Sequence, residues 1–190
     1  KQGSIDYELS LYMMRKTDDI ISYRDPVTDQ RTTVNSGETL HRGVEAGVGI
    51  PLHPEWRVDT SLAYAKHTYE QWSLSGTANY SGKEMEMAPR VIANTRMTYT
   101  PEFMNRGHIQ AEWLSLGSYW RDPANTSKYD GHDLVHLHAR YPIDKTWELY
   151  GNVNNLFDTQ NAETSALSSG APVYTVGLPR TAFLGVQAKW

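Results

Sequence analysis

Residues 4–14, SIDYELSLYMM, show the pattern that decides the fold. The apolar side chains of this stretch stand at every second position: Ile5, Tyr7, Leu9, Leu11 and Met13. An alternation with period two predicts a β-strand, because successive side chains of a strand point to opposite faces. A helix would instead repeat its apolar residues every three or four positions.

The same alternation recurs seven more times along the chain, and no segment has convincing helical periodicity. The further stretches are 43–50, 56–66, 91–99, 108–120, 132–141, 147–155 and 182–190. The sequence therefore predicts an all-β protein, with about eight strands in an antiparallel up-and-down meander.

The connections between these strands alternate between short and long. The short ones, 51–55, 101–107 and 142–146, each contain a proline, which ends a strand because it has no N–H to donate. The long ones are polar and cover 24–33, 70–90, 121–131 and 159–180. Short turns at one end and long loops at the other are typical of outer-membrane barrels. We therefore expect the meander to be part of a transmembrane β-barrel.

The aromatic residues favour the same interpretation, since 12 Tyr and 6 Trp stand against 3 Phe. Tyr and Trp gather at the two interfaces of a membrane. At the short-turn ends we expect membrane-interface anchors at Trp56, Tyr99, Trp147 and Trp190. At the long-loop ends we expect a second girdle of Tyr69, Trp72, Tyr119 and Trp120. The alternative is a soluble β-sandwich or lipocalin-like barrel, but the polar strand face is richer in Glu, Asn, Arg, His and Gln than that requires.

Composition excludes several other classes of protein. The net charge of −4 offers no basic field for nucleic acid. Without cysteine there is no disulfide, thiolate metal site or cysteine nucleophile. No Gly-x-Ser-x-Gly elbow, phosphate-binding glycine loop or His-Glu-x-x-His motif is present, so we expect neither an enzyme nor a bound cofactor. A barrel-borne hydrolase built from distant residues stays an alternative.

Four motifs together resemble the TonB-dependent outer-membrane receptors, and in the order of that family. They are the asparagine stretch 34–38 followed by RGVE at 42–45, MAPR at 87–90, NNLFD at 154–158, and GLPR at 177–180 before a last strand that ends on Trp190. Each motif is weak alone, but together they cover essentially the whole chain.

This resemblance implies a function and a set of partners. We expect residues 1–190 to be the C-terminal portion of a barrel in the outer membrane of a Gram-negative bacterium, without the N-terminal plug domain of the family. The receptor would take up a ferric siderophore or a similar scarce nutrient, with TonB contacting the missing N-terminal region. Membrane lipid and the barrel assembly machinery, which reads the last strand, would be further partners. The alternative is a small self-contained barrel acting as an adhesin or structural protein.

The loop 118–130 is the candidate ligand site, because aromatic rings and cations suit a bulky anionic chelate. Its predicted binding residues are Tyr119, Trp120, Arg121, Lys128 and Tyr129. The alternative is that Tyr119 and Trp120 belong to the girdle, while Arg121 meets lipid head groups. Residues 69–80 and 162–174 are similar loops, and the Ser, Gly and Ala of the second suggest mobility.

His132, His136 and His138 share one strand face. Two such histidines bind a metal when a neighbouring strand adds a third ligand. The simpler alternative is hydrogen bonding to Glu148, Asn152 or water, and we predict no metal site.

Overall fold

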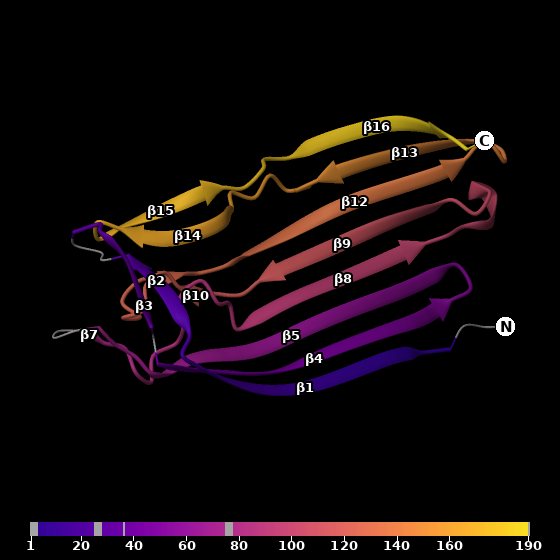
Figure 1. Cartoon of the computed structure of the whole chain (residues 1–190). Coiled ribbons are helices and arrows are strands. Elements are labelled where there is room, and N and C mark those ends of the chain that lie inside the picture. Colours follow the sequence, from indigo (N-terminus) through magenta and orange to yellow (C-terminus); the bar gives the residue numbers. More distant parts are fainter. Residues whose placement is uncertain (1–3, 25–27, 36, 75–77, 190) are drawn as a thin grey trace.

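The computed structural model describes residues 4–24, 28–35, 37–74 and 78–189. Eight long strands lie side by side in one antiparallel sheet, ordered β1-β4-β5-β8-β9-β12-β13-β16 (Figure 1). Their bounds are β1 (Asp6–Thr17), β4 (Glu38–His53), β5 (Trp56–Gln71), β8 (Val91–Tyr99), β9 (His108–Leu116), β12 (His132–Pro142), β13 (Trp147–Asn154) and β16 (Thr181–Ala188). The predicted all-β meander is confirmed.

Long strands that follow one another in sequence are neighbours in the sheet, which is open, with β1 and β16 as its two edges. The strands differ in length. β4 and β5 have 16 residues each, whereas β8 and β9 have 9. Since a membrane-crossing strand needs about 9–11 residues, β4 and β5 are long enough to extend beyond a bilayer.

The long connections lie together at one end of the sheet, here called the long-loop end, and the short ones at the other, the short-turn end (Figure 1). Each long connection contains a two-stranded hairpin: β2 (Ile20–Arg24) with β3 (Arg31–Asn35), β6 (Ser73–Leu74) with β7 (Ala78–Asn79), β10 (Tyr119–Trp120) with β11 (Lys128–Tyr129), and β14 (Ala162–Ser168) with β15 (Ala171–Val176). These hairpins were not predicted, because two to seven residues are too few for a clear alternation.

The short-turn end contains a single turn of 3-10 helix, η1 (Glu102–Met104). Among the described residues, no helix has the length and apolar character needed to cross a membrane.

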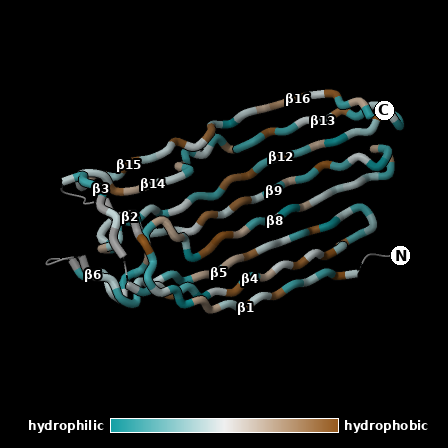
Figure 2. Tube along the Cα trace, viewed as in Figure 1, coloured by the Kyte–Doolittle hydropathy of each residue, from teal (hydrophilic) through white to brown (hydrophobic). Residues whose placement is uncertain are grey.

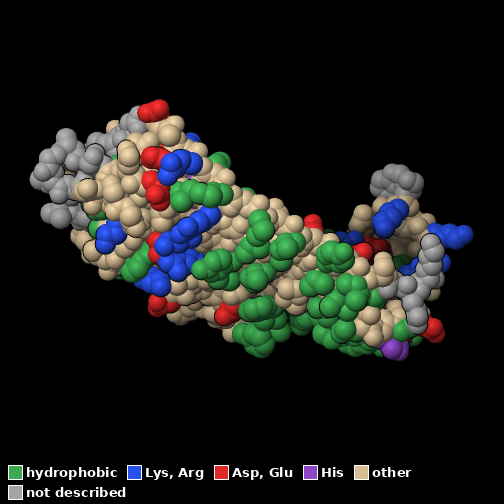
Figure 3. All heavy atoms as spheres, turned by 90° about the horizontal axis from the view of Figure 1, so that it is seen from below, with side chains coloured by type: hydrophobic (Ala, Val, Ile, Leu, Met, Phe, Trp, Pro, Cys, Tyr) green, Lys and Arg blue, Asp and Glu red, His purple; other side chains and the backbone are tan. Residues whose placement is uncertain are grey.

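The alternation divides the sheet into an apolar and a polar face. Leu11 of β1 is paired with Val44 of β4, and Val44 with Tyr64 of β5, so the apolar side chains form rows across the strands. Figure 2 shows the alternation along each strand, and Figure 3 shows apolar side chains gathered on the surface of the sheet. They are strongly exposed, with Leu11 at 76% and Leu184 at 86%. An apolar face this open suits an apolar surrounding such as lipid.

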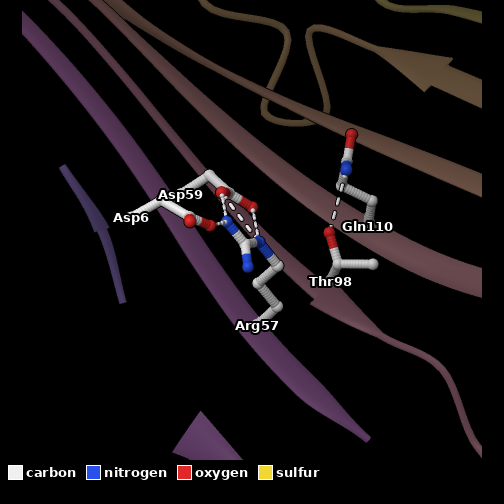
Figure 4. A network of polar contacts seen from close by, with 5 residues as sticks. All are labelled: Asp6, Arg57, Asp59, Thr98 and Gln110. Carbon is white, nitrogen blue, oxygen red and sulfur yellow. Dashed lines mark hydrogen bonds and ion pairs between the residues drawn. The ribbon is translucent and has the colours of Figure 1, made fainter. Parts of the chain in front are cut away.

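The polar face carries hydrogen-bonded side chains, most clearly around Arg57 near the short-turn end (Figure 4). Its Nε donates to both carboxylate oxygens of Asp59, at 2.9 and 3.0 Å, and its Nη2 lies 2.9 Å from Asp6 Oδ2 on β1. The guanidinium spans β4 to do so. Gly49 makes this possible, because a Cβ there would lie 2.1 Å from Arg57 Nη2.

Aromatic residues behave differently at the two ends. At the short-turn end, Trp56 stacks on Tyr99 with ring centroids 4.3 Å apart, and Trp147 is 48% exposed. Trp190 lies outside the described residues. At the long-loop end, Tyr69 and Trp72 are only 1% exposed and Tyr119 only 5%. The predicted second girdle is therefore wrong for these three residues, which form small cores inside the loops.

Candidate ligand site at the long-loop end

Arg121 joins the β10–β11 hairpin to the β14–β15 hairpin. Its Nε donates to Ser165 Oγ at 2.7 Å, and its Nη2 donates to the hydroxyl of Tyr174 at 3.2 Å. Its Nη1 donates to Ser127 Oγ at 3.1 Å and to the carbonyl of Lys128. These contacts use the fork of donors that only arginine supplies. Two segments some 40–50 residues apart are thereby held together.

The rings of Tyr119 and Tyr129 lie beneath this network, with centroids 5.2 Å apart. The hydroxyl of Tyr119 accepts the N–H of Ser165 at 2.8 Å, and that of Tyr129 accepts the N–H of Ala162 at 3.2 Å. Burial raises the pKa of Tyr119, so its hydroxyl stays neutral. The tyrosines thus satisfy buried backbone groups of β14, which would otherwise cost free energy.

The turn between β10 and β11 is also fastened to the preceding long connection. Buried Asp122 accepts the backbone N–H groups of Thr126 and Ser127, at 3.0 and 2.8 Å. The side chain of Asn125 bonds both the N–H and the carbonyl of Glu84, at 2.9 and 2.8 Å. Three long connections therefore form one cross-linked platform.

Two neighbouring hollows open beside this platform. The larger, about 610 Å³, lies between Tyr129, Tyr174 and the chain segments 158–162 and 176–179. The second, about 510 Å³, lies on the polar face, with His132 and His136 in its lining. A patch of apolar side chains on that face also lines it: Ile92, Leu114, Leu116 and Leu134.

Asn161, Gly177 and Pro179 line both hollows, so the hollows adjoin. Asn161 Oδ1 and His136 Nε2 are buried and have no hydrogen-bond partner among the described residues. An acceptor and a ring nitrogen are thus available to a group that enters the second hollow.

The five predicted binding residues are brought together but divided between two sides of the β10–β11 hairpin. Tyr119 and Tyr129 form one cross-strand pair and Trp120 and Lys128 the next, so the two pairs point to opposite sides. Lys128 Nζ lies 5.4 Å from the ring centroid of Trp120. Arg121 is engaged within the platform, so the alternative that it meets lipid head groups is wrong.

Ser165 and Tyr174 lie in the loop 162–174, which was predicted to resemble the candidate site but to be mobile, and neither was singled out. Asn161, just before that loop, was not predicted either. In the structure this segment is a hairpin, with β14 paired to β15 and Ser165 only 1% exposed. Small polar residues fit this hairpin because they pack beneath the tyrosines and Arg121.

The NNLFD and GLPR motifs clasp the base of the same hairpin. The side chain of Asn155 is 3% exposed and bonds the backbone at Thr159, through both N–H and carbonyl, and the carbonyl of Leu178. Asp158 Oδ1 accepts the N–H of Arg180 at 2.8 Å. Both motifs were available in the sequence as a signal, and their role here is structural.

The histidines of β12 follow the hydrogen-bonding alternative. His138 Nδ1 lies 3.0 Å from Asn152 Oδ1, as expected, and its Nε2 lies 3.4 Å from Glu112. His136 Nδ1 accepts the N–H of Asn155 at 3.2 Å. In the described part of the chain, no three His, Asp or Glu side chains are grouped as metal ligands.

Comparison with known proteins identifies the fold. The family model described as "TonB dependent receptor-like, beta-barrel" matches residues 1–156. The chain belongs to the TonB-dependent receptor family. Members of this family are transporters, not enzymes, which disfavours the alternative of a barrel-borne enzyme.

Individual relatives of this TonB-dependent receptor segment agree. The probable TonB-dependent siderophore receptor PiuA of Acinetobacter baumannii is 25% identical over 169 residues, which are 85% of this chain and 22% of that protein. The crystal structure of PiuA gives a TM-score of 0.77 at 21% identity, over 98% of this chain and 26% of that one. The chain thus spans about a quarter of the length of these relatives.

Two further structures share the fold. The ferric yersiniabactin uptake receptor FyuA of Yersinia pestis has a TM-score of 0.76 at 15% identity, covering 99% of this chain and 28% of its own. The copper transporter OprC has a TM-score of 0.76 at 20% identity, covering 97% and 29%. Because proteins named for such different cargo match alike, the fold alone does not select a ligand.

Proposed function

We propose that this chain is part of the barrel wall and outer loops of a receptor that takes up a ferric siderophore or a similar nutrient chelate through the outer membrane. The observation that carries the proposal is the family match over residues 1–156, supported by relatives named as siderophore receptors. The exposed apolar face supports a position in lipid, with the long-loop end outside the cell. The adhesin or structural barrel has no comparable support.

In this proposal, residues 1–190 form the C-terminal portion of the barrel, and the plug and the TonB contact come from elsewhere in the receptor. The last strand, β16, would be read by the barrel assembly machinery. Trp56, Tyr99 and Trp147 would lie at the periplasmic interface of the outer membrane, where ring and polar tip meet both surroundings.

The ligand would enter the larger hollow beside Tyr174, which is 53% exposed and lies beneath the guanidinium of Arg121, 5.4 Å from its ring centroid. An aromatic ring held under a fixed cation suits an anionic chelate with flat groups. Tyr129 forms the floor. Of the five predicted residues, Tyr129 therefore keeps a proposed role in the hollow. Arg121 would act indirectly, by holding Tyr174 in place, and Tyr119 would support both from beneath, while Trp120 and Lys128 face elsewhere.

Uptake of radioactive iron tests this proposal in cells that lack the receptor gene and carry the full-length gene on a plasmid. We expect at least one of a panel of ferric catecholate, hydroxamate and carboxylate siderophores to be taken up, only when TonB is present. Uptake of none, in cells whose outer membrane contains the receptor, would overturn it. An antibody to residues 121–131 should detect a heat-modifiable band several times heavier than 21.6 kDa; a band near that mass would favour the small barrel.

The site is tested by Tyr174→Ala, which should weaken binding of that siderophore to the purified receptor about tenfold, as loss of a tyrosine anchor does. Tyr174→Phe is the matched control and should bind within about threefold of wild type, because it keeps the ring. Equal binding by both variants would place the ligand elsewhere.

A further inference from the structure

Two histidines of neighbouring strands contact one another on the polar face, near the long-loop end. His41 of β4 and His67 of β5 are direct cross-strand partners, and their ring centroids lie 5.0 Å apart. Their Nδ1 atoms are only 2.8 Å apart, so one ring donates a hydrogen bond to the other. The two Nδ1 atoms are thus directed at one another. The hollow proposed for the nutrient ligand lies on other strands and uses neither residue.

A methionine extends this pair into a row across three neighbouring strands. Met14 of β1 is the direct partner of His41, as His41 is of His67 (Figure 1). Directly opposite residues of antiparallel strands point to the same face, with Cβ atoms about 4.5–5.5 Å apart. Met14 is 52% exposed, and its long, unbranched side chain can turn its sulfur toward the His41 ring. The row therefore brings two imidazoles and one thioether to the same part of the polar face.

Thr39 supports the His41 ring from the side away from His67. His41 Nε2 lies 3.1 Å from Oγ1 of Thr39, which is 0% exposed. When Nδ1 of a histidine binds a metal ion, the proton of the neutral ring is on Nε2. Metal-binding histidines usually donate that second N–H to an oxygen of the protein, which fixes the orientation of the ring. The hydroxyl of Thr39 is in place to accept it.

Both rings are suited to bind a cation at neutral pH. They lie beyond the Arg42–Lys66 pair, where the apolar alternation ends, and so beyond the stretch that would span the membrane. Burial lowers the pKa of His67, and burial together with the charge of His67 lowers the pKa of His41, so both rings are mainly neutral. Two nitrogens bound to one tetrahedral ion at about 2.0 Å lie about 3.3 Å apart. The contact between the rings has to open by only about 0.5 Å to admit such an ion.

We propose that Met14, His41 and His67 form a binding site for a monovalent copper ion, with Met14 Sδ and the two Nδ1 atoms as ligands. Thioether sulfur favours Cu(I), and imidazole is a good ligand for copper. The ring that now donates moves its proton from Nδ1 to Nε2, so both Nδ1 lone pairs face the ion and no proton is released. The site is separate from the nutrient hollow, and it binds the bare ion instead of a chelate.

The test uses the full-length receptor without a purification tag, titrated with Cu(I) in the absence of oxygen against a chelator that becomes coloured when it binds Cu(I). We expect the double variant His41→Gln/His67→Gln to bind one copper ion fewer than wild type. Met14→Leu should lose at least about tenfold in affinity, since losing even an outer partner of a metal ligand costs about that much. Met13→Leu is the matched control, because Met13 lies on the apolar face opposite Arg42 and should bind as wild type.

X-ray absorption at the copper edge, on receptor loaded with one copper ion, reads out the ligands directly. We expect two nitrogen neighbours and one sulfur, and the sulfur should be missing in Met14→Leu but present in Met13→Leu. Unchanged copper binding in the double histidine variant, or equal behaviour of the two methionine variants, would overturn the inference. Copper binding is measured without siderophore, so its failure would leave the proposed function intact, and failure of siderophore uptake would leave the copper site intact.

Discussion

The two ends of the sheet are built differently. The long-loop end contains the small cores of the structure, around Tyr69 with Trp72 and around Tyr119 with Tyr129. At the short-turn end only Pro101 and Met104 of the described turns have buried apolar side chains, and the Trp56–Tyr99 pair stacks on the surface. The turn 142–146 is exposed apart from Pro142, which is partly buried.

This difference indicates where side-chain substitutions should affect stability. Backbone hydrogen bonds between the strands stabilise both ends of the sheet. Among the described residues, only the long-loop end adds buried polar side chains that bond several connections at once. Losing a buried partner costs the desolvation free energy of the group left behind, whereas an exposed group finds water instead. The stability of the outer platform should therefore depend on single residues, and that of the short turns should not.

The largest effect is expected from Asn155→Ala, which leaves buried backbone groups at Thr159 and Leu178 without partners. The loss should be about 3 kcal/mol. The measurement uses the full-length receptor, whose folded barrel migrates faster than the unfolded chain in gel electrophoresis. The loss of stability is read from the lowered temperature at which half of the protein no longer migrates as the folded form. Asn154→Ala is the control, because the side-chain hydrogen bond from Asn154 to Thr181 is a long one of 3.4 Å. Equal losses would mean that the clasp is not the source of stability.

A smaller effect is expected from Tyr69→Phe. The hydroxyl of Tyr69 donates to Glu86 Oε2 at 2.5 Å, and burial together with the Glu86 carboxylate raises the pKa of Tyr69. Loss of a hydrogen bond to a charged acceptor should cost about 2 kcal/mol in the same measurement. Tyr7→Phe removes a hydroxyl from a ring that is 85% exposed and should change nothing measurable. An effect of Tyr7→Phe as large as that of Tyr69→Phe would contradict the greater importance of buried side chains at the long-loop end.

At the short-turn end, Trp56→Ala should cost about 1 kcal/mol through the lost stack on Tyr99. A double-mutant cycle with Tyr99→Ala separates this contact from burial, since the coupling free energy belongs to the pair alone. A coupling near zero would show that the two rings act independently as interface anchors.

The smallest effect is expected in the turn 142–146. Asp144 accepts the backbone N–H groups of Trp147 and Thr146, at 2.8 and 2.7 Å. Both hydrogen bonds lower the pKa of Asp144, and the bond from Trp147 lowers it most. A lowered pKa in the folded state stabilises the turn above the usual aspartate pKa of about 3.9, and this stabilisation is lost as the pH falls through the folded value. Above that pH, the Trp147 amide should therefore exchange its hydrogen faster in Asp144→Asn than in Asp144→Glu. Below it, the two variants should exchange at the same rate. The same difference below pH 3 would contradict a role of the charge.

Much of the fold could be predicted because a strand is recognisable from the alternation of its own residues. The eight long strands, the short turns and the composition of each face follow from side chains that alternate by the geometry of the extended chain. The extra length of β4 and β5 could not be predicted, since Arg42 and Lys66 interrupt the apolar alternation where the strands continue. The small hairpins were equally hidden, because their residues pair through contacts that no periodicity records.

The candidate site was predicted in part. The loop 118–130 was correctly placed at the long-loop end, from composition and from the order of short and long connections. Its partners Ser165 and Tyr174 come from a segment whose own composition suggested mobility. That segment lines the hollow because the folded chain brings it into contact with Arg121.

The strands, their two faces and the family were thus readable from the amino-acid order, since each depends on residues that are neighbours along the chain. The tertiary structure alone decided which side of the β10–β11 hairpin each binding residue takes, and which distant loops it meets. The physical reason is that hydrogen bonds such as those of Arg121 join groups 44 and 53 positions apart. Nothing in the local sequence selects such partners; they are selected when the sheet brings the ends of its strands together.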